Sequence, residues 1–131
     1  MGFWSSEASL HEILRAMAFT LSFLKSFFLS AYLISPVICL LLAVIIGLGQ
    51  LVGRFEHWSR SDALYYAFIT ATTVGYGDFR PSHRRSKLTA IAIALTGILL
   101  TGIVVAIGLK ALESAFLEHH NVEELRAKFN E

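Results

Sequence analysis

The sequence predicts an all-α membrane protein in which two helices span the bilayer and a shorter helix enters it and stops halfway. Of the 131 residues, 55% are hydrophobic and only 16% are charged. A soluble domain of this size cannot bury that much apolar surface. Two apolar runs, at about 27–52 and 86–115, are long enough to cross a bilayer, and a third at about 61–72 is too short.

Charge and cysteine content argue against several other classes. The net charge of +1 gives no reason to expect a nucleic-acid partner. The single cysteine, Cys39, has no intrachain disulfide partner and sits in an apolar run, which favours a packing role. The polar residues of the membrane region include no nucleophile with a plausible base, so we expect neither an enzyme nor a cofactor.

The N-terminal segment, 1–26, is predicted to be an amphipathic interfacial helix. Apolar residues recur there at helical spacing, with charged residues elsewhere, which favours a helix at the membrane surface. The alternative is that it extends the first membrane helix into water. A row formed by Phe19, Phe23 and Phe27 blurs the amphipathic division and keeps this alternative open.

The pore domain predicted over 27–115 begins with the first spanning helix, 27–52. At 1.5 Å per residue it reaches about 39 Å, enough to cross with some tilt. Pro36 lies inside it and either kinks the helix or, with Ser35 as a cap, restarts it at the inner interface. Trp58, in the following loop, suits a membrane interface.

The short apolar run at 61–72 is predicted to be a helix that ends within the membrane. Ser59 or Ser61 can cap it, and Asp62 complements its positive N-terminal end. Non-helical backbone at membrane depth is tolerated only where protein or a water-filled cavity surrounds it. The segment after this helix therefore requires neighbouring subunits.

The second spanning helix is predicted over 86–115, followed by a cytoplasmic helical tail over 116–131. The tail is charged, with apolar residues that could pack a short bundle. Asn121 with Glu124 three residues later is a capping signal, which predicts that the helix breaks and restarts at Asn121.

Residues 72–78 read Thr-Thr-Val-Gly-Tyr-Gly-Asp, between the short apolar run and the second long one. Glycines at alternate positions can adopt backbone angles that other residues avoid. Consecutive carbonyls can then face one axis and replace the hydration shell of K⁺. The string and its setting resemble the pore module of potassium channels, most closely the small bacterial channels with two transmembrane helices per subunit. The resemblance covers about residues 30–115 and implies a homotetramer around a central pore, because each chain supplies one copy of the filter.

The same resemblance assigns the K⁺ sites to the filter backbone. Thr73 supplies a hydroxyl and a carbonyl at the inner end, Val74, Gly75 and Tyr76 supply carbonyls, and Gly77 lies at the outer mouth. Non-selective relatives carry a different residue at the position of Tyr76. Its presence implies selectivity for K⁺ over Na⁺.

Filter support is expected from Thr72, Asp78 and the residues behind them. Some family members pair the aspartate with a buried glutamate, and here Ile69 stands at that position. We therefore expect the hydroxyl of Tyr65 to donate a hydrogen bond to Asp78. The alternative is that Tyr65 and its neighbour Tyr66 only pack as a cuff around the filter.

Arg80 departs from the family pattern in a second way. Relatives that are sensitive to external tetraethylammonium often carry an aromatic residue there. A ring of Arg80 side chains would repel cations, so weak external block is expected.

The gate is predicted on the second spanning helix. In the family a glycine at the position of Gly97 lets the helix bend, and a glycine inside a helix costs about 1 kcal/mol relative to alanine. The alternative is close helix packing. We favour the hinge at Gly97 and packing at Gly102. One helical face is expected to line the cavity and lower pore, with its last two members as a hydrophobic constriction: Ile98, Thr101, Val105 and Leu109.

The sequence thus predicts a K⁺-selective channel that conducts passively, with a non-selective cation channel or a non-conducting accessory membrane subunit as alternatives. The expected partners are three identical subunits, membrane lipid and permeant K⁺. The expected location is a bacterial inner (plasma) membrane with both termini cytoplasmic. The distribution of positive residues would not choose this orientation, which follows from the resemblance instead.

The gating stimulus stays open at this stage. No spanning helix carries an arginine-rich repeat, so no voltage sensor is expected. His119 and His120, next to Glu118, could titrate near neutral pH or bind metal, although a solvated face is the favoured interpretation. The resemblance to proton-opened bacterial relatives suggests pH. Whether a cytoplasmic regulatory domain is missing from this chain is also left open.

Overall fold

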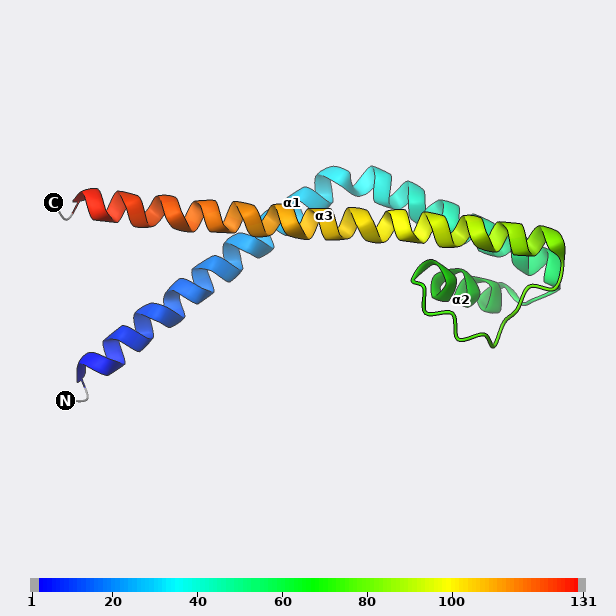
Figure 1. The fold of residues 1–131 in the computed structure, drawn as a ribbon, viewed down its shortest axis with the longest axis horizontal. Helices are drawn as coiled ribbons and strands as arrows, with labels where there is room; N and C mark the ends of the chain where they lie inside the picture. Colours follow the sequence, from blue (N-terminus) through cyan, green and yellow to red (C-terminus); the bar gives the residue numbers. More distant parts are fainter. Residues whose placement is uncertain (1–2, 130–131) are drawn as a thin grey trace. The chain divides into compact units, whose positions relative to one another are not determined.

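Three helices make up the described part of the chain. The computed structural model describes the backbone of residues 3–129, and the side chains of residues 10, 12–118, 120, 121 and 128. Within this part there is no strand, and the helices are α1 (Phe3–Glu56), α2 (Arg60–Ala71) and α3 (Arg84–Phe129) (Figure 1).

Two of these helices can span a membrane. The stretches Glu12–Glu56 of α1 and Arg84–Glu118 of α3 are long and apolar enough to cross a bilayer, and α2, with 12 residues, is not. The predicted all-α fold with two membrane helices and a short helix between them is confirmed.

Two helix breaks that the sequence allowed are absent. α1 continues without interruption past residue 26 and through Pro36, so of the two alternatives for Pro36, a kink or a restart, the restart does not occur. α3 continues through Asn121 to Phe129, so the predicted break there is wrong. No glycine or proline follows Asn121, and asparagine inside a helix costs less than 1 kcal/mol, too little to end a helix of good helix formers. The side chain of Glu124 lies outside the described ones.

The chain forms two compact units, one of which joins the two ends of the chain. This unit comprises Met1–Leu33 and Ala106–Glu131. In it the ring of Phe19 on α1 meets the ring of Phe116 on α3 edge-on, with the centroids 5.1 Å apart. Ala115, one residue before Phe116, is buried. α3 around Ala115 and Phe116 therefore packs against α1 around Phe19.

The other unit, Ile34–Val105, holds α2 against α1 through small residues. A Cβ added at Gly49 would lie 2.4 Å from the Cβ of Ala67, and one added at Gly53 would lie 2.5 Å from the Cβ of Ala63. Residues four apart share one face of a helix. The two glycines and two alanines therefore let the two backbones approach more closely than larger side chains would allow.

α1 ends at Glu56 in a left-handed turn. His57 has a φ of 59°, and the N–H of Trp58 donates to the carbonyl of Gly53 at 2.9 Å. This 6→1 hydrogen bond with a left-handed residue is the Schellman pattern, which satisfies carbonyls at a helix end. It turns the chain back toward α2.

Ser59 caps α2. Its Oγ accepts a hydrogen bond from the N–H of Asp62 at 3.1 Å. Of the two caps that the sequence allowed, Ser59 and Ser61, the first is therefore the N-cap.

The carboxylate of Glu56 joins the end of α1 to the start of α3. Its Oε1 accepts from the N–H groups of Ser82, at 2.9 Å, and His83, at 3.0 Å, and its Oε2 accepts from the Ser82 hydroxyl at 2.5 Å. The His83 carbonyl accepts from the N–H of Lys87 at 3.0 Å, so His83 begins the helical pattern. A negative charge is favourable at this end of a helix. The Glu56 side chain is only 5% exposed.

Aromatic side chains pack together where the segment after α2 meets α2 and the loop before it. The ring of Trp58 meets the rings of Tyr66, at 5.1 Å, and Phe79, at 5.0 Å. These residues belong to or border the buried core of this unit, which consists of Ile45, Val52, Tyr66, Ala67, Ala71 and Ile93. The loop after α2 is therefore held against the protein at Phe79.

Candidate functional site

The backbone after α2 alternates in handedness. Thr73, Gly75 and Gly77 have φ values of 61°, 52° and 79°. Positive φ at the two glycines is what their spacing predicted. Positive φ at Thr73 was not foreseen, because a β-branched residue rarely adopts it. Such strain persists where the surrounding structure over-determines it, often at functional sites.

The last turn of α2 supplies that constraint. The carbonyl of Ile69 accepts hydrogen bonds from the N–H of Val74 at 3.0 Å and from the N–H of Gly75 at 3.1 Å. The N–H of Thr73 donates to the carbonyl of Thr70 at 3.1 Å. Carbonyls that the helix end would leave unpaired therefore hold the next three residues in place. Ile69 acts here through its backbone, which its side-chain chemistry could not indicate.

Thr72 ends α2 as its C-cap. Its N–H and its hydroxyl both donate to the carbonyl of Phe68, at 2.9 Å and 2.7 Å. The hydroxyl is therefore committed to the helix.

The C-terminal end of the segment carries an arginine contact that the sequence did not indicate. The Nε of Arg80 donates to the carbonyl of Gly77 at 2.9 Å. Asp78, between them, accepts from the N–H of Phe79 through Oδ1 at 3.0 Å. The positive charge of Arg80 is thus directed at the last carbonyl of the glycine-rich segment.

Tyr65 lies near Asp78 and contacts the aromatic cluster. The partial burial of its ring raises the pKa of Tyr65, and the nearby carboxylate of Asp78 raises it further. Its ring also meets the ring of Phe79, with centroids 6.0 Å apart. The ring packing that was the alternative is therefore present, and the hydrogen bond expected from the Tyr65 hydroxyl to Asp78 stays a prediction.

The base of the segment touches α3 at Gly97. A Cβ added there would lie 2.0 Å from the carbonyl oxygen of Ala71, the last residue of α2. Gly97 is therefore closely packed against the end of α2, and its role as a hinge stays a prediction. A Cβ added at Gly102 would meet nothing within 4 Å, so the packing expected of Gly102 has no partner within this chain.

Several side chains around the segment have no cover from their own chain. Val74 is 52% exposed and Tyr76 is 74% exposed. On α3 the four residues expected to line a pore are exposed as well: Ile98, Thr101, Val105 and Leu109.

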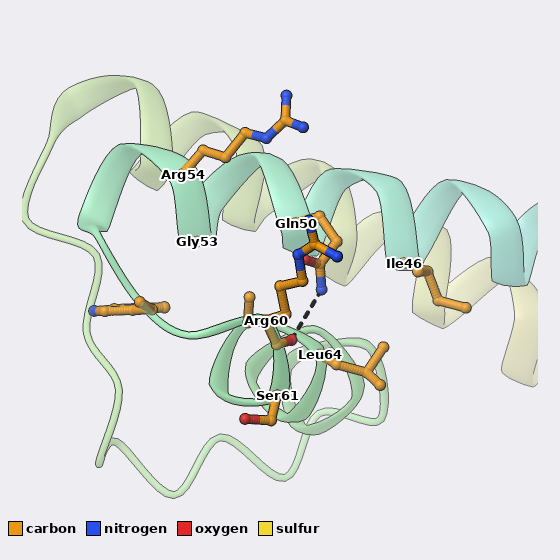
Figure 2. Close-up of a pocket in the computed structure, with 9 residues that line it drawn as sticks. Ile46, Gln50, Gly53, Arg54, Arg60, Ser61 and Leu64 are labelled. Carbon is orange, nitrogen blue, oxygen red and sulfur yellow. Dashed lines mark hydrogen bonds between the residues drawn. The ribbon is translucent and has the colours of Figure 1, made fainter.

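A cavity of about 610 Å³ lies between α1 and α2 on another side of the site. Figure 2 shows Gln50 reaching from α1 to the carbonyl of Arg60, a hydrogen bond of 3.0 Å from Nε2. This contact, which sequence analysis did not identify, fixes the N-terminal turn of α2. No group of three His, Cys, Asp or Glu side chains gathers as a metal site among the described residues. His120 is exposed, and His119 lies outside the described side chains.

A chain with two membrane helices and a half-length helix that ends in such a segment has the architecture of an ion-channel pore. The chain belongs to the ion channel family, whose sequence pattern matches residues 28–114. It is therefore an integral membrane protein, and its family is not a class of enzymes.

The similar proteins include several potassium channels. The chain is 49% identical to two-pore potassium channel 1 of Arabidopsis thaliana over 41 residues, which cover 31% of this chain and 11% of that protein. It is 57% identical to a voltage-gated potassium channel of Aeropyrum pernix over 37 residues, 28% of this chain and 12% of that protein. It is 32% identical to potassium channel subfamily K member 2 of Homo sapiens over 74 residues, 56% of this chain and 17% of that protein.

The chain thus spans less than a fifth of the length of each of these three relatives. No solved structure matches it significantly. The resemblance to potassium-channel pores that the sequence suggested is confirmed.

Proposed function

We propose that the chain is the subunit of a K⁺-selective channel that conducts K⁺ passively across the membrane. The observation that carries the proposal is the backbone of Thr73–Gly77, which alternates in the sign of φ and is tied to the end of a half-length helix. Membership of the ion channel family and the potassium channels among the relatives support it.

The proposed K⁺ ligands are backbone oxygens. Alternating φ signs turn successive peptide planes so that their N–H groups gather on one side, which leaves the carbonyls on the other. Carbonyls of Thr73, Val74, Gly75 and Tyr76 would replace the hydration shell of K⁺, with Gly77 at the outer mouth. No organic cofactor is needed for passive conduction. The tyrosine at 76 favours K⁺ over Na⁺.

The pore is proposed to be a homotetramer. One chain carries one copy of the filter, and a ring of carbonyls needs several. The exposure of Val74 and Tyr76 in the single chain supports neighbouring subunits as cover. Lipid is the proposed cover for the remaining apolar surface of α1 and α3.

The charge distribution along α2 suits a cation. Asp62 lies in its first turn, and no basic residue lies in its last turn. The negative end of the helix dipole therefore stays uncompensated near Thr72, where a cation would pause before the filter.

The gate is proposed on α3. Gly97 would let the helix bend, and Val105 with Leu109 would form a constriction that closes by dewetting. The proposed location is a bacterial inner membrane with both termini cytoplasmic. Internal pH is the first stimulus to test.

Planar-bilayer recording of the purified chain under a K⁺/Na⁺ gradient, with steps of internal pH, tests this proposal. We expect a reversal potential near that of K⁺. The variant Gly75→Ala supplies the control, because an added Cβ meets no atom within 4 Å and acts only through the positive φ. We expect it to lose selectivity.

Two other results would replace the proposal. A reversal potential near zero for the unchanged chain would favour the non-selective cation channel. No current at any pH, from protein shown to be folded and inserted, would favour the non-conducting accessory subunit.

A further inference from the structure

Three arginines line one cavity in the unit that also contains the proposed filter. The cavity has a volume of about 450 Å³, within the range of about 300–1,000 Å³ that is typical of small-molecule sites. It lies where α1 ends and α3 begins, and all of its lining belongs to the unit Ile34–Val105. The lining residues are Arg54, Phe55, His57, His83, Arg84 and Arg85.

The three guanidinium groups have no anionic partner within the described part of the chain. Arg54, Arg84 and Arg85 are exposed, and none of them makes an ion pair or a side-chain hydrogen bond with a described residue. Like charges held around one cavity repel one another. An anion that enters the cavity therefore relieves this repulsion as well as forming its own contacts.

The one carboxylate at this place is already committed. Both oxygens of Glu56 accept hydrogen bonds from Ser82 and His83, and the side chain is 5% exposed. Its negative charge serves the start of α3, so the three guanidinium groups around the cavity stay without a counter-charge from Glu56.

Arg54 borders both this cavity and the one between α1 and α2. Figure 2 shows Arg54 extending from the side of α1 that faces away from α2, while Gln50 and Arg60 meet on the α2 side. The guanidinium of Arg54 is therefore free of the polar contacts that fix α2.

We propose that this cavity binds a phosphate group, with Arg54, Arg84 and Arg85 as its ligands. The planar guanidinium fork matches two phosphate oxygens at once, which makes arginine well suited to phosphate recognition. His57 and His83 line the same cavity and add imidazole groups to it. The site lies at the ends of the two membrane helices, where the phosphate can belong to an anionic lipid headgroup or to a free anion. The binding does not depend on ion conduction.

The test is the thermal unfolding midpoint of the purified, delipidated full chain in detergent, titrated separately with inorganic phosphate, phosphatidylglycerol and phosphatidylcholine at constant ionic strength. A ligand that binds only the folded state raises the midpoint in a saturable way. The variants are the double change Arg84→Gln with Arg85→Gln, and Arg54→Gln on the other helix. The matched control is Arg60→Gln, because Arg60 is exposed but does not line this cavity.

We expect saturable stabilisation by phosphatidylglycerol, by inorganic phosphate or by both, and little from phosphatidylcholine. Stabilisation by phosphatidylglycerol alone identifies a lipid headgroup, and stabilisation by inorganic phosphate identifies a free anion. Both cavity variants should weaken binding by about tenfold or more, with Arg60→Gln unchanged. No stabilisation by either ligand, or an equal loss in Arg60→Gln, would overturn the proposal. If the double variant fails to fold, the change in binding caused by Arg54→Gln alone tests the proposal.

Discussion

Replacing Gly97 with alanine tests how the second membrane helix meets the base of the filter. The added Cβ would lie 2.0 Å from the carbonyl oxygen of Ala71 and 2.5 Å from its carbonyl carbon and its Cα. Carbon atoms pack at about 3.5–4.0 Å, so α2 or α3 would have to move by about 1 Å. All three obstructing atoms are backbone atoms of Ala71, so no side-chain rotation can relieve the overlap.

The expected magnitude follows from two opposing effects. Overpacking of this kind costs about 1–3 kcal/mol. Alanine is favoured over glycine inside a helix by about 1 kcal/mol. Because the obstacle at Gly97 is backbone, we expect the overpacking to prevail and the variant to lose about 1–2 kcal/mol of stability. At Gly102, where nothing lies within 4 Å, the same substitution should gain up to about 1 kcal/mol.

The assay is chemical unfolding of the two variants in detergent, each in a Trp4→Phe background, so that tryptophan fluorescence reports Trp58, which packs against Tyr66 and Phe79. Bilayer recording of the same variants separates packing from bending. Movement of the filter base should alter K⁺ selectivity, whereas loss of a hinge alone would alter open probability and leave the unfolding midpoint near its original value. Equal stabilisation by both substitutions would refute the close approach of Gly97 to Ala71.

Four further changes test other contacts. Gly53→Ala should destabilise the chain because its Cβ would lie 2.5 Å from the Cβ of Ala63, and adding Ala63→Gly should restore stability. A double-mutant cycle in the unfolding assay should give a coupling of about 1–2 kcal/mol, and additive effects would argue against the contact. Glu56→Gln places amide donors against the N–H groups that begin α3, so we expect a loss of about 1–3 kcal/mol. Faster amide hydrogen exchange in the first turn of α3 would show this loss of stability. Unchanged exchange would argue against the contact of Glu56 with the start of α3. Tyr65→Phe keeps the ring and removes the hydroxyl that we expect to donate to Asp78, so the stability or inactivation of the proposed filter should change. Unchanged steady-state current and inactivation would contradict this. Because Arg80 is positively charged, external block by tetraethylammonium should be weak. The variant Arg80→Tyr should strengthen this block. Block of the unchanged channel at micromolar tetraethylammonium would contradict the prediction.

Helix number and type could be predicted because they depend on local properties. The length of an apolar run determines whether it can cross a bilayer. A serine such as Ser59 can cap a helix that begins next to it. The left-handed backbone at Gly75 and Gly77 followed from the absence of a Cβ. Thr73 adopts the same conformation only because hydrogen bonds to the end of α2 hold its neighbours, which no property of threonine indicates.

The helix boundaries were predicted less well where a weak local signal competed with helix continuity. Pro36 and Asn121 both lie inside unbroken helices. Once a helix exists, each further residue adds a hydrogen bond at little cost, so a single unfavourable residue rarely ends it.

The sequence alone therefore determined the class of the fold and the glycine-spaced segment that we propose as the filter, since length, apolarity and glycine spacing act through neighbours in the chain. The tertiary structure decided which distant residues meet. Glu56 accepts a hydrogen bond from Ser82, 26 positions away, and Gly97 of α3 lies close to Ala71 at the end of α2. Arg80 turns toward the carbonyl of Gly77. Such contacts depend on helix direction and on the space between backbones, and only the folded chain defines these.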